Sequence, residues 1–106
     1  MSAELEAALA DLLRRWQAGA IDPAGVKRWA ESQAGARASD PIREAIAALD
    51  LLEVHLLTVE DVPALLALCA GGDQAVASWR SYRDAIDLDA RSKKLRKNPF
   101  YRPFCR

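Results

Sequence analysis

Apolar residues recur at helical spacing along most of this 106-residue chain, and this period restricts the fold more than any other feature. The first stripe has leucines at i, i+4, i+7 and i+8 from Leu5 to Leu13, and Trp16 follows at i+11. This spacing places the apolar side chains on one face of an α-helix. No stretch shows the alternating period of a strand rich in β-branched and aromatic residues. The sequence therefore predicts an all-α fold.

Start and stop signals divide the chain into about five helices that form a single compact bundle. Asp22-Pro23 and Ser39-Asp40-Pro41 each pair a capping side chain with a proline suited to the first helical turn. Thr58 to Asp61 is typical of a capping box, and Gly71-Gly72 ends the helix that follows. The aperiodic apolar segment 51–57 is expected to cross the core. Side chains expected to be mostly buried are Leu9, Trp16, Trp29, Ile46, Leu66, Trp79 and Ile86.

The length is that of one domain that can bury a core without a metal or a disulfide. No apolar run approaches the roughly 20 residues that a membrane-spanning helix needs, and the acidic N-terminus is not a signal peptide. We therefore expect a cytoplasmic protein that makes no use of a membrane. Cys69, Cys105 and the single His55 do not have the spacing of a zinc site, and no metal or other cofactor is expected.

The net charge of zero conceals a split along the chain. All 15 acidic residues lie at or before Asp89, whereas 7 of the 15 basic residues lie after Ala90. Residues 1–90 thus carry 8 − 15 = −7, and residues 91–106 carry +7. We describe residues 1–90 as an acidic helical bundle and residues 91–106 as a basic, aromatic C-terminal extension of the same domain. Opposite charges on one chain either neutralise each other or bind partners of opposite charge.

The acidic residues provide the first candidate site, a negative surface that would attract a basic protein by electrostatic steering. Some of these residues flank His55 in the sequence, and others are expected on the last helix. The candidates are Asp50, Glu53, Glu60, Asp61, Asp84, Asp87 and Asp89. The alternative is a solvated face with helix caps, because acidic residues are favoured in the first turn of any helix.

The tail provides the second candidate site, since it interleaves cations with Phe100, Tyr101 and Phe104. Cations neutralise phosphates and rings stack on bases, so the tail has the ingredients of a single-strand binder. The candidate nucleic-acid contacts are Lys93, Lys94, Arg96, Lys97, Tyr101 and Arg102. We favour another interpretation, in which residues 91–97 extend the last helix, the three rings dock on the bundle and the cations lie near its acidic residues.

These patterns favour a protein that is not an enzyme. His55 lies near Glu53, but no nucleophile or second positioned group accompanies it. The leading hypothesis is a protein-binding module, in its most concrete form a small cytoplasmic inhibitor of the bacterial immunity-protein or antitoxin type. The alternative is a nucleic-acid-binding accessory protein that acts through the basic tail. A third possibility is a subunit that completes its fold against a larger partner.

Overall fold

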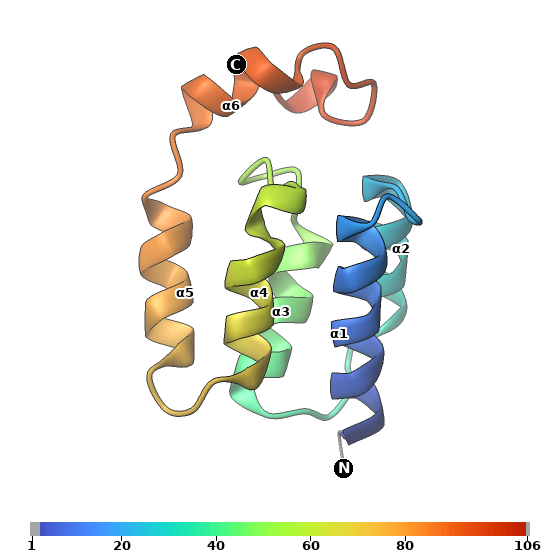
Figure 1. Cartoon of the computed structure of the whole chain (residues 1–106), viewed down its shortest axis with the longest axis vertical. Helices are drawn as coiled ribbons and strands as arrows, with labels where there is room; N and C mark the ends of the chain where they lie inside the picture. Colours follow the sequence, from blue (N-terminus) through green and yellow to red (C-terminus); the bar gives the residue numbers. More distant parts are fainter. Residues whose placement is uncertain (1–2, 106) are drawn as a thin grey trace.

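The computed structural model describes residues 3–105, which form six α-helices joined by short connections (Figure 1). The helices are α1 (Ala3–Gln17), α2 (Pro23–Ser32), α3 (Asp40–Asp50), α4 (Val62–Ala70), α5 (Ala75–Asp84) and α6 (Leu88–Leu95). Two 3-10 helices, η1 (Val59–Asp61) and η2 (Arg102–Phe104), precede α4 and follow α6. Residues 3–105 contain no strand, so the predicted all-α class is confirmed. In this range no helix has both the length and the apolar content that crossing a membrane requires.

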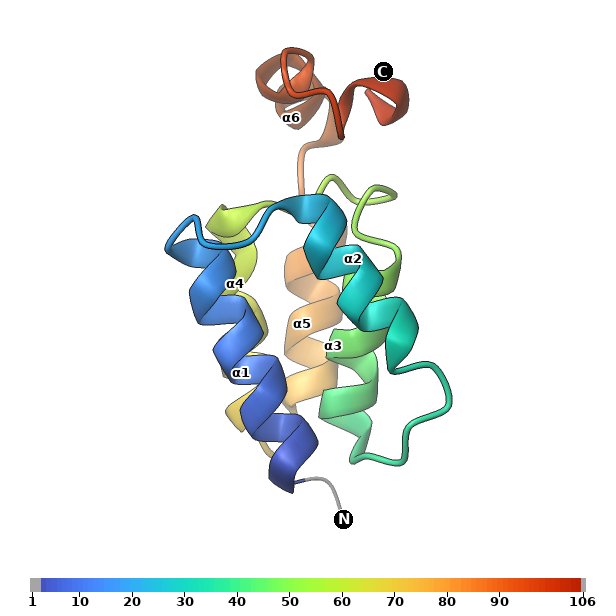
Figure 2. The ribbon, with the colours of Figure 1, turned by 90° about the vertical axis from the view of Figure 1, so that its right-hand side faces the viewer.

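Helices α1 to α5 lie side by side, and α6 with the tail lies across one end of them (Figures 1 and 2). Helix α4 packs against α1, α3 and α5, and α2 packs against α3. This central position buries four side chains of α4, those of Val62, Leu65, Leu68 and Cys69. The molecule measures 40 × 26 × 24 Å, and its longest dimension includes both the bundle and the segment across its end.

The hydrophobic core follows the predicted stripes. Leu9, Trp16, Ile46 and Trp79 are buried, and each such side chain contributes about 1.5–3 kcal/mol relative to full exposure. The other predicted core residues are partly buried and pack at its margin, namely Trp29, Leu66 and Ile86. Segment 51–57 sends three side chains into the core, those of Leu52, Leu56 and Leu57.

Two of the predicted helix starts are present with their hydrogen bonds. The Asp22 carboxylate accepts a hydrogen bond of 2.7 Å from the Gly25 N–H, and α2 begins at Pro23. At η1, the Thr58 hydroxyl accepts from the Glu60 N–H at 3.2 Å, and the Asp61 carboxylate accepts from the Thr58 N–H at 2.8 Å. This reciprocal pair is the predicted capping box, and it encloses the Asp61 side chain.

The structure has two helices where the sequence predicted one last helix, because the helix is interrupted before Asp87. Helix α5 ends at Asp84, and the Asp87 carboxylate starts α6 by accepting a hydrogen bond of 3.0 Å from the Ala90 N–H. Aspartate competes with the helix backbone in this way, so it favours a cap over a helix interior. The prediction that residues 91–97 prolong one last helix is therefore wrong. Asp84, Asp87 and Asp89 do not share a helix.

Candidate functional site

A buried carboxylate connects α6 to the bundle. Asp61, at the end of η1, is fully buried. Arg91 of α6 donates to both its oxygens, from Nη1 to Oδ2 at 2.5 Å and from Nη2 to Oδ1 at 2.8 Å. The Tyr82 hydroxyl of α5 donates to Oδ1 at 2.6 Å. The prediction that Asp61 lies on an acidic surface is wrong, because the capping box and two other helices enclose it.

The hydrogen bonds around Asp61 keep this junction charged. Burial alone would raise the pKa of Asp61, but hydrogen bonds from Arg91, Tyr82 and the Thr58 N–H outweigh it and hold that pKa below its ordinary value. The same carboxylate raises the pKa of Arg91 by hydrogen bonding. Burial and the hydrogen bond to Asp61 raise the pKa of Tyr82. At neutral pH the junction is therefore an ion pair with a protonated phenol beside it.

Tyr101 fastens the tail to the bundle. Its side chain is only 2% exposed, and its hydroxyl donates to the carbonyl oxygen of Leu57. Phe100 is partly buried and meets Tyr101 edge to face, with 5.1 Å between the ring centroids. Phe104 is 47% exposed. The predicted docking of three rings is thus wrong for Phe104, and Tyr101 is too deeply buried to serve as the predicted nucleic-acid contact.

The cations of the tail fall into two groups. Arg91 is turned inward to Asp61, whereas the cations predicted to contact a nucleic acid are exposed, namely Lys93, Lys94, Arg96, Lys97 and Arg102. Among residues 3–105, no ion pair joins Lys93, Lys94 or Lys97 to a carboxylate, although their proximity to acidic residues was expected. The neutralisation expected from the charge split therefore occurs at Arg91 and leaves these lysines unpaired. Arg106 lies outside the described residues.

The remaining acidic candidates have separate surroundings. Glu53 forms an ion pair of 3.1 Å with Lys27, and Asp84 forms one of 3.1 Å with Arg83. Asp87 caps α6, and Asp89 lies in the first turn of the same helix. Asp50 ends α3, and Glu53 and Glu60 lie between it and the buried Asp61. We call residues 50–60 the apical segment.

The apical segment exposes apolar side chains that sequence reasoning missed. Five large hydrophobic residues are exposed within the described chain, and the apical segment contains three of them. These are Leu51 at 52%, Val54 at 54% and Val59 at 43% exposure. The sequence of this segment contains a signal for the exposure of these side chains. An apolar run without a helical period, bounded by acidic residues, has no single face that can be buried. The structure thus brings exposed apolar groups and carboxylates together on one short segment.

Contacts from three other parts of the chain hold the backbone of the apical segment. Lys27 of α2 donates to the carbonyl oxygen of Asp50 and to the carboxylate of Glu53. Arg91 donates to the carbonyl oxygen of Leu56 at 3.1 Å, next to the bond between Tyr101 and Leu57. Leu56 has a φ of +52°, a left-handed conformation that costs a non-glycine residue about 1–2 kcal/mol. These contacts stabilise a strained backbone in one pre-formed shape.

The environments of Cys69 and His55 do not favour reactivity. Burial raises the pKa of the Cys69 thiol to about 11, so this thiol is protonated at neutral pH. Burial and the positive charge of Arg83 lower the pKa of His55, against an opposing effect of Asp84. Within residues 3–105 no group of three or more histidine, cysteine or acidic side chains is placed to hold a metal ion.

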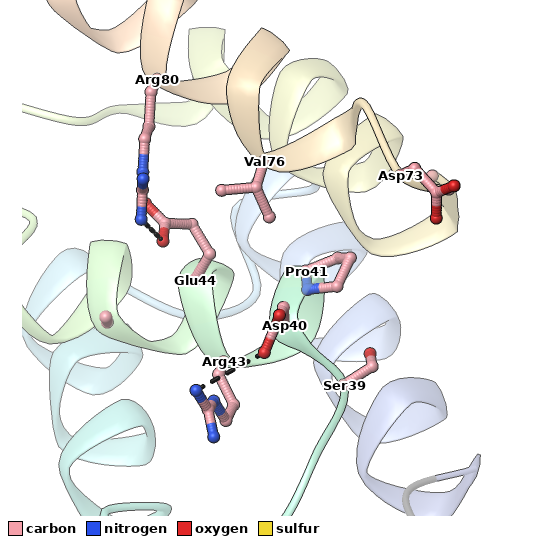
Figure 3. A pocket seen from close by; sticks show the side chains of 11 residues that line it. Ser39, Asp40, Pro41, Arg43, Glu44, Asp73, Val76 and Arg80 are labelled. Carbon is pink, nitrogen blue, oxygen red and sulfur yellow. Dashed lines mark hydrogen bonds and ion pairs between the residues drawn. The ribbon is translucent and has the colours of Figure 1, made fainter.

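An open groove of about 860 Å³ separates the start of α3 from α5 at the opposite end of the bundle (Figure 3). Four of the charged side chains that line it form two pairs. Arg80 donates to both oxygens of Glu44, at 3.1 and 2.8 Å, and Arg43 forms an ion pair of 3.5 Å with Asp40. Figure 3 shows Arg80 and Glu44 meeting across the groove. Because these charges satisfy one another, we assign no ligand to this groove.

Comparison of the chain with protein-family models, curated proteins and solved structures found no match. Two surfaces of the molecule itself are the candidates for a function. One is the apical segment, with its apolar and acidic side chains. The other is the exposed basic face of α6 and the tail.

Proposed function

We propose that this chain is a non-enzymatic protein-binding module that recognises a basic partner through the apical segment. In its most concrete form it is a small inhibitor of the immunity-protein or antitoxin type. One observation carries this proposal: Leu51, Val54 and Val59 are exposed on the segment that also bears Glu53 and Glu60. Exposed apolar residues beside charged groups are the composition of a protein interface, in which buried anchors are surrounded by a polar rim.

The pre-formed backbone makes this segment suited to tight binding. A partner that covers Leu51 and Val54 removes apolar area from water, which contributes roughly 25 cal/mol for each Å² buried. Ordering a free loop would offset much of that gain. The contacts of Lys27, Arg91 and Tyr101 have already ordered this backbone during folding. The binding free energy is therefore not spent on ordering the segment.

The acidic side chains favour a basic partner. Glu60 is exposed at the start of η1. Such charges chiefly accelerate encounter and select partners of opposite sign. Enzymes that act on nucleic acids are basic where they hold phosphates. A toxic nuclease is consequently the class of partner that best fits an inhibitor with this surface.

Site-specific photocrosslinking in the native host tests the proposal. A benzophenone amino acid at Val54 should crosslink a basic protein, which mass spectrometry identifies. The same group at Ala8, an exposed position on α1, should not crosslink that protein. With the purified partner, the double variant Leu51→Ser/Val54→Ser should bind at least tenfold more weakly, because interface anchors contribute more than about 1 kcal/mol each. Phe104→Ser should bind like the wild type.

The binding kinetics separate anchors from steering charges. Glu60→Gln should slow association and weaken its salt dependence, with little change in dissociation. Leu51→Ser/Val54→Ser should mainly accelerate dissociation. Crosslinking of an acidic protein at Val54 would contradict the proposal. So would equal affinity of the partner for the wild type and the double variant.

A further inference from the structure

Helix α6 and the tail present a basic face that the proposed function does not use. Figures 1 and 2 show this part of the chain lying across the end of the bundle at which α5 ends. Lys93, Lys94 and Lys97 are exposed within and just after α6, and Arg102 is exposed in η2. Arg91, by contrast, is turned inward and neutralised by Asp61.

From this arrangement we infer that the face binds single-stranded nucleic acid. Lys93, Lys94, Lys97 and Arg102 contact consecutive phosphates, and Phe104 stacks on a base. Each part has its own physical basis. Exposed cations release counterions from the phosphate backbone, and an exposed ring binds any unpaired base through its π face.

The charge on this face exceeds what the fold requires. A helix C-terminus favours nearby cations, but its dipole amounts to only about half an elementary charge. Lys93 and Lys94 in the last turn of α6 already more than satisfy it, and Lys97 and Arg102 follow beyond the helix. Among residues 3–105 the three lysines have no carboxylate partner. Their charges are consequently available to a polyanion.

The ring at the end of the tail distinguishes a nucleic acid from other polyanions. Phe104 is 47% exposed, and Phe100 supports it from 6.3 Å between centroids. Tyr101 holds this pair of rings on the bundle through Leu57. The ring is thus held in η2, the short helix that also carries Arg102, as a stacking platform must be. Bases in a single strand can reach such a platform, whereas bases in a duplex are already stacked.

Fluorescence anisotropy with the full chain and a labelled single-stranded oligonucleotide of roughly 20 nucleotides tests the inference. Four phosphate contacts predict a slope of about −3 in log affinity against log salt, and hence a loss of roughly 50-fold between about 50 and 200 mM salt. The triple variant Lys93→Ala/Lys94→Ala/Lys97→Ala should bind at least tenfold more weakly and reduce the slope by about 2. Phe104→Ala should weaken binding to the single strand roughly tenfold and leave binding to a matched duplex unchanged.

A matched control removes the same charge elsewhere. Arg14, Arg28 and Arg37 are exposed on other parts of the chain, so Arg14→Ala/Arg28→Ala/Arg37→Ala should retain most of the affinity. Thermal melting should show that both triple variants fold. Equal losses in the two triple variants would overturn the inference, because net charge would then explain binding. It would also be overturned if phosphatidylserine vesicles bound through the three lysines while the oligonucleotide did not bind. Leu51→Ser/Val54→Ser should bind the oligonucleotide normally, which separates this surface from the apical segment.

Discussion

At the scale of single residues, Asp61 shows how far a side chain's role depends on its neighbours. The sequence places it among the acidic residues that start a helix. In the structure it closes the capping box with Thr58 and also receives Arg91 and Tyr82. Leaving one partner of a buried ion pair unmatched typically costs 3–5 kcal/mol, whereas an exposed pair contributes about 0–1 kcal/mol. The stability of the junction therefore depends on this carboxylate.

Replacing Asp61 with asparagine should lower the free energy of unfolding by about 3 kcal/mol, because Arg91 would lose its charged partner. Urea denaturation at neutral pH measures this change. The control is Glu60→Gln, which removes the adjacent exposed acid and should change the free energy by less than about 0.5 kcal/mol. Similar effects of the two substitutions would show that Asp61 does not hold the junction.

The pH dependence of stability should report the same carboxylate. The pKa of Asp61 is lower in the folded chain than the ordinary value of about 3.9, so its contribution is complete above that value. The contribution is lost as the pH falls through the lower folded pKa. The difference in unfolding free energy between the wild type and Asp61→Asn should therefore be constant from about pH 7 to 5 and smaller near pH 3. Urea denaturation across this range checks the prediction, and a difference that persists at pH 3 would contradict it.

At the scale of elements, the turn between α4 and α5 distinguishes two glycines that look alike in the sequence. A Cβ atom on Gly71 would lie 2.3 Å from the Cβ of Ala75 and 3.0 Å from the carbonyl oxygen of Ala67. A Cβ atom on Gly72 would have no such neighbour within 4 Å. Gly71 therefore caps α4 and allows the first turn of α5 to approach its end, whereas a side chain at Gly72 would enter open space.

Gly71→Ala should destabilise the protein by about 1–3 kcal/mol, since the added methyl group forces the two helices apart. Gly72→Ala is the matched control. It should change stability by less than about 1 kcal/mol and can raise it by reducing the entropy of the unfolded chain. Thermal and urea unfolding of the two variants provide the comparison. A larger loss from Gly72→Ala than from Gly71→Ala would show that the close approach is wrongly assigned.

At the scale of the whole molecule, a few buried contacts join the basic extension to the acidic bundle. The contacts are the pair of Arg91 with Asp61, the bond of Arg91 to Leu56 and the bond of Tyr101 to Leu57. Salt screens exposed charges over roughly 10 Å, but it screens buried pairs much less. The association of the two parts is consequently expected to resist added salt, despite their opposite net charges.

Deletion of residues 99–106 should lower the melting temperature by roughly 10 °C. The deletion removes the buried ring of Tyr101 and its hydrogen bond, about 2–4 kcal/mol together. Raising the salt concentration to about 0.5 M should shift the melting temperature of the intact chain by far less. Tyr101→Phe isolates the hydrogen bond and should cost about 1 kcal/mol. An unchanged melting temperature after the deletion would show that the tail is not anchored by Tyr101.

Local signals in the sequence determined the helices. The stripe from Leu5 to Trp16, the Asp22-Pro23 start and the Thr58 capping box depend on residues within a few positions of one another, and they predict what the structure contains. The break at Asp87 also has a local cause, and the sequence alone was sufficient to find it. Asp87 lies between two apolar residues and resembles the cap at Asp22. The apolar face from Val76 to Ile86 nevertheless favours a single uninterrupted helix, so the cap was not predicted.

Only the tertiary structure decided which of these helical faces and caps are covered. Asp61 is buried because Tyr82 and Arg91, 21 and 30 residues away in the sequence, converge on it. Leu51 and Val54 are exposed because the side chains of Leu52 and Leu56 take the places in the core instead. The period of the apolar residues predicts that a side chain is buried, but it does not identify the distant segment that packs against that side chain. That choice depends on how six helices share one core, which is a property of the whole chain.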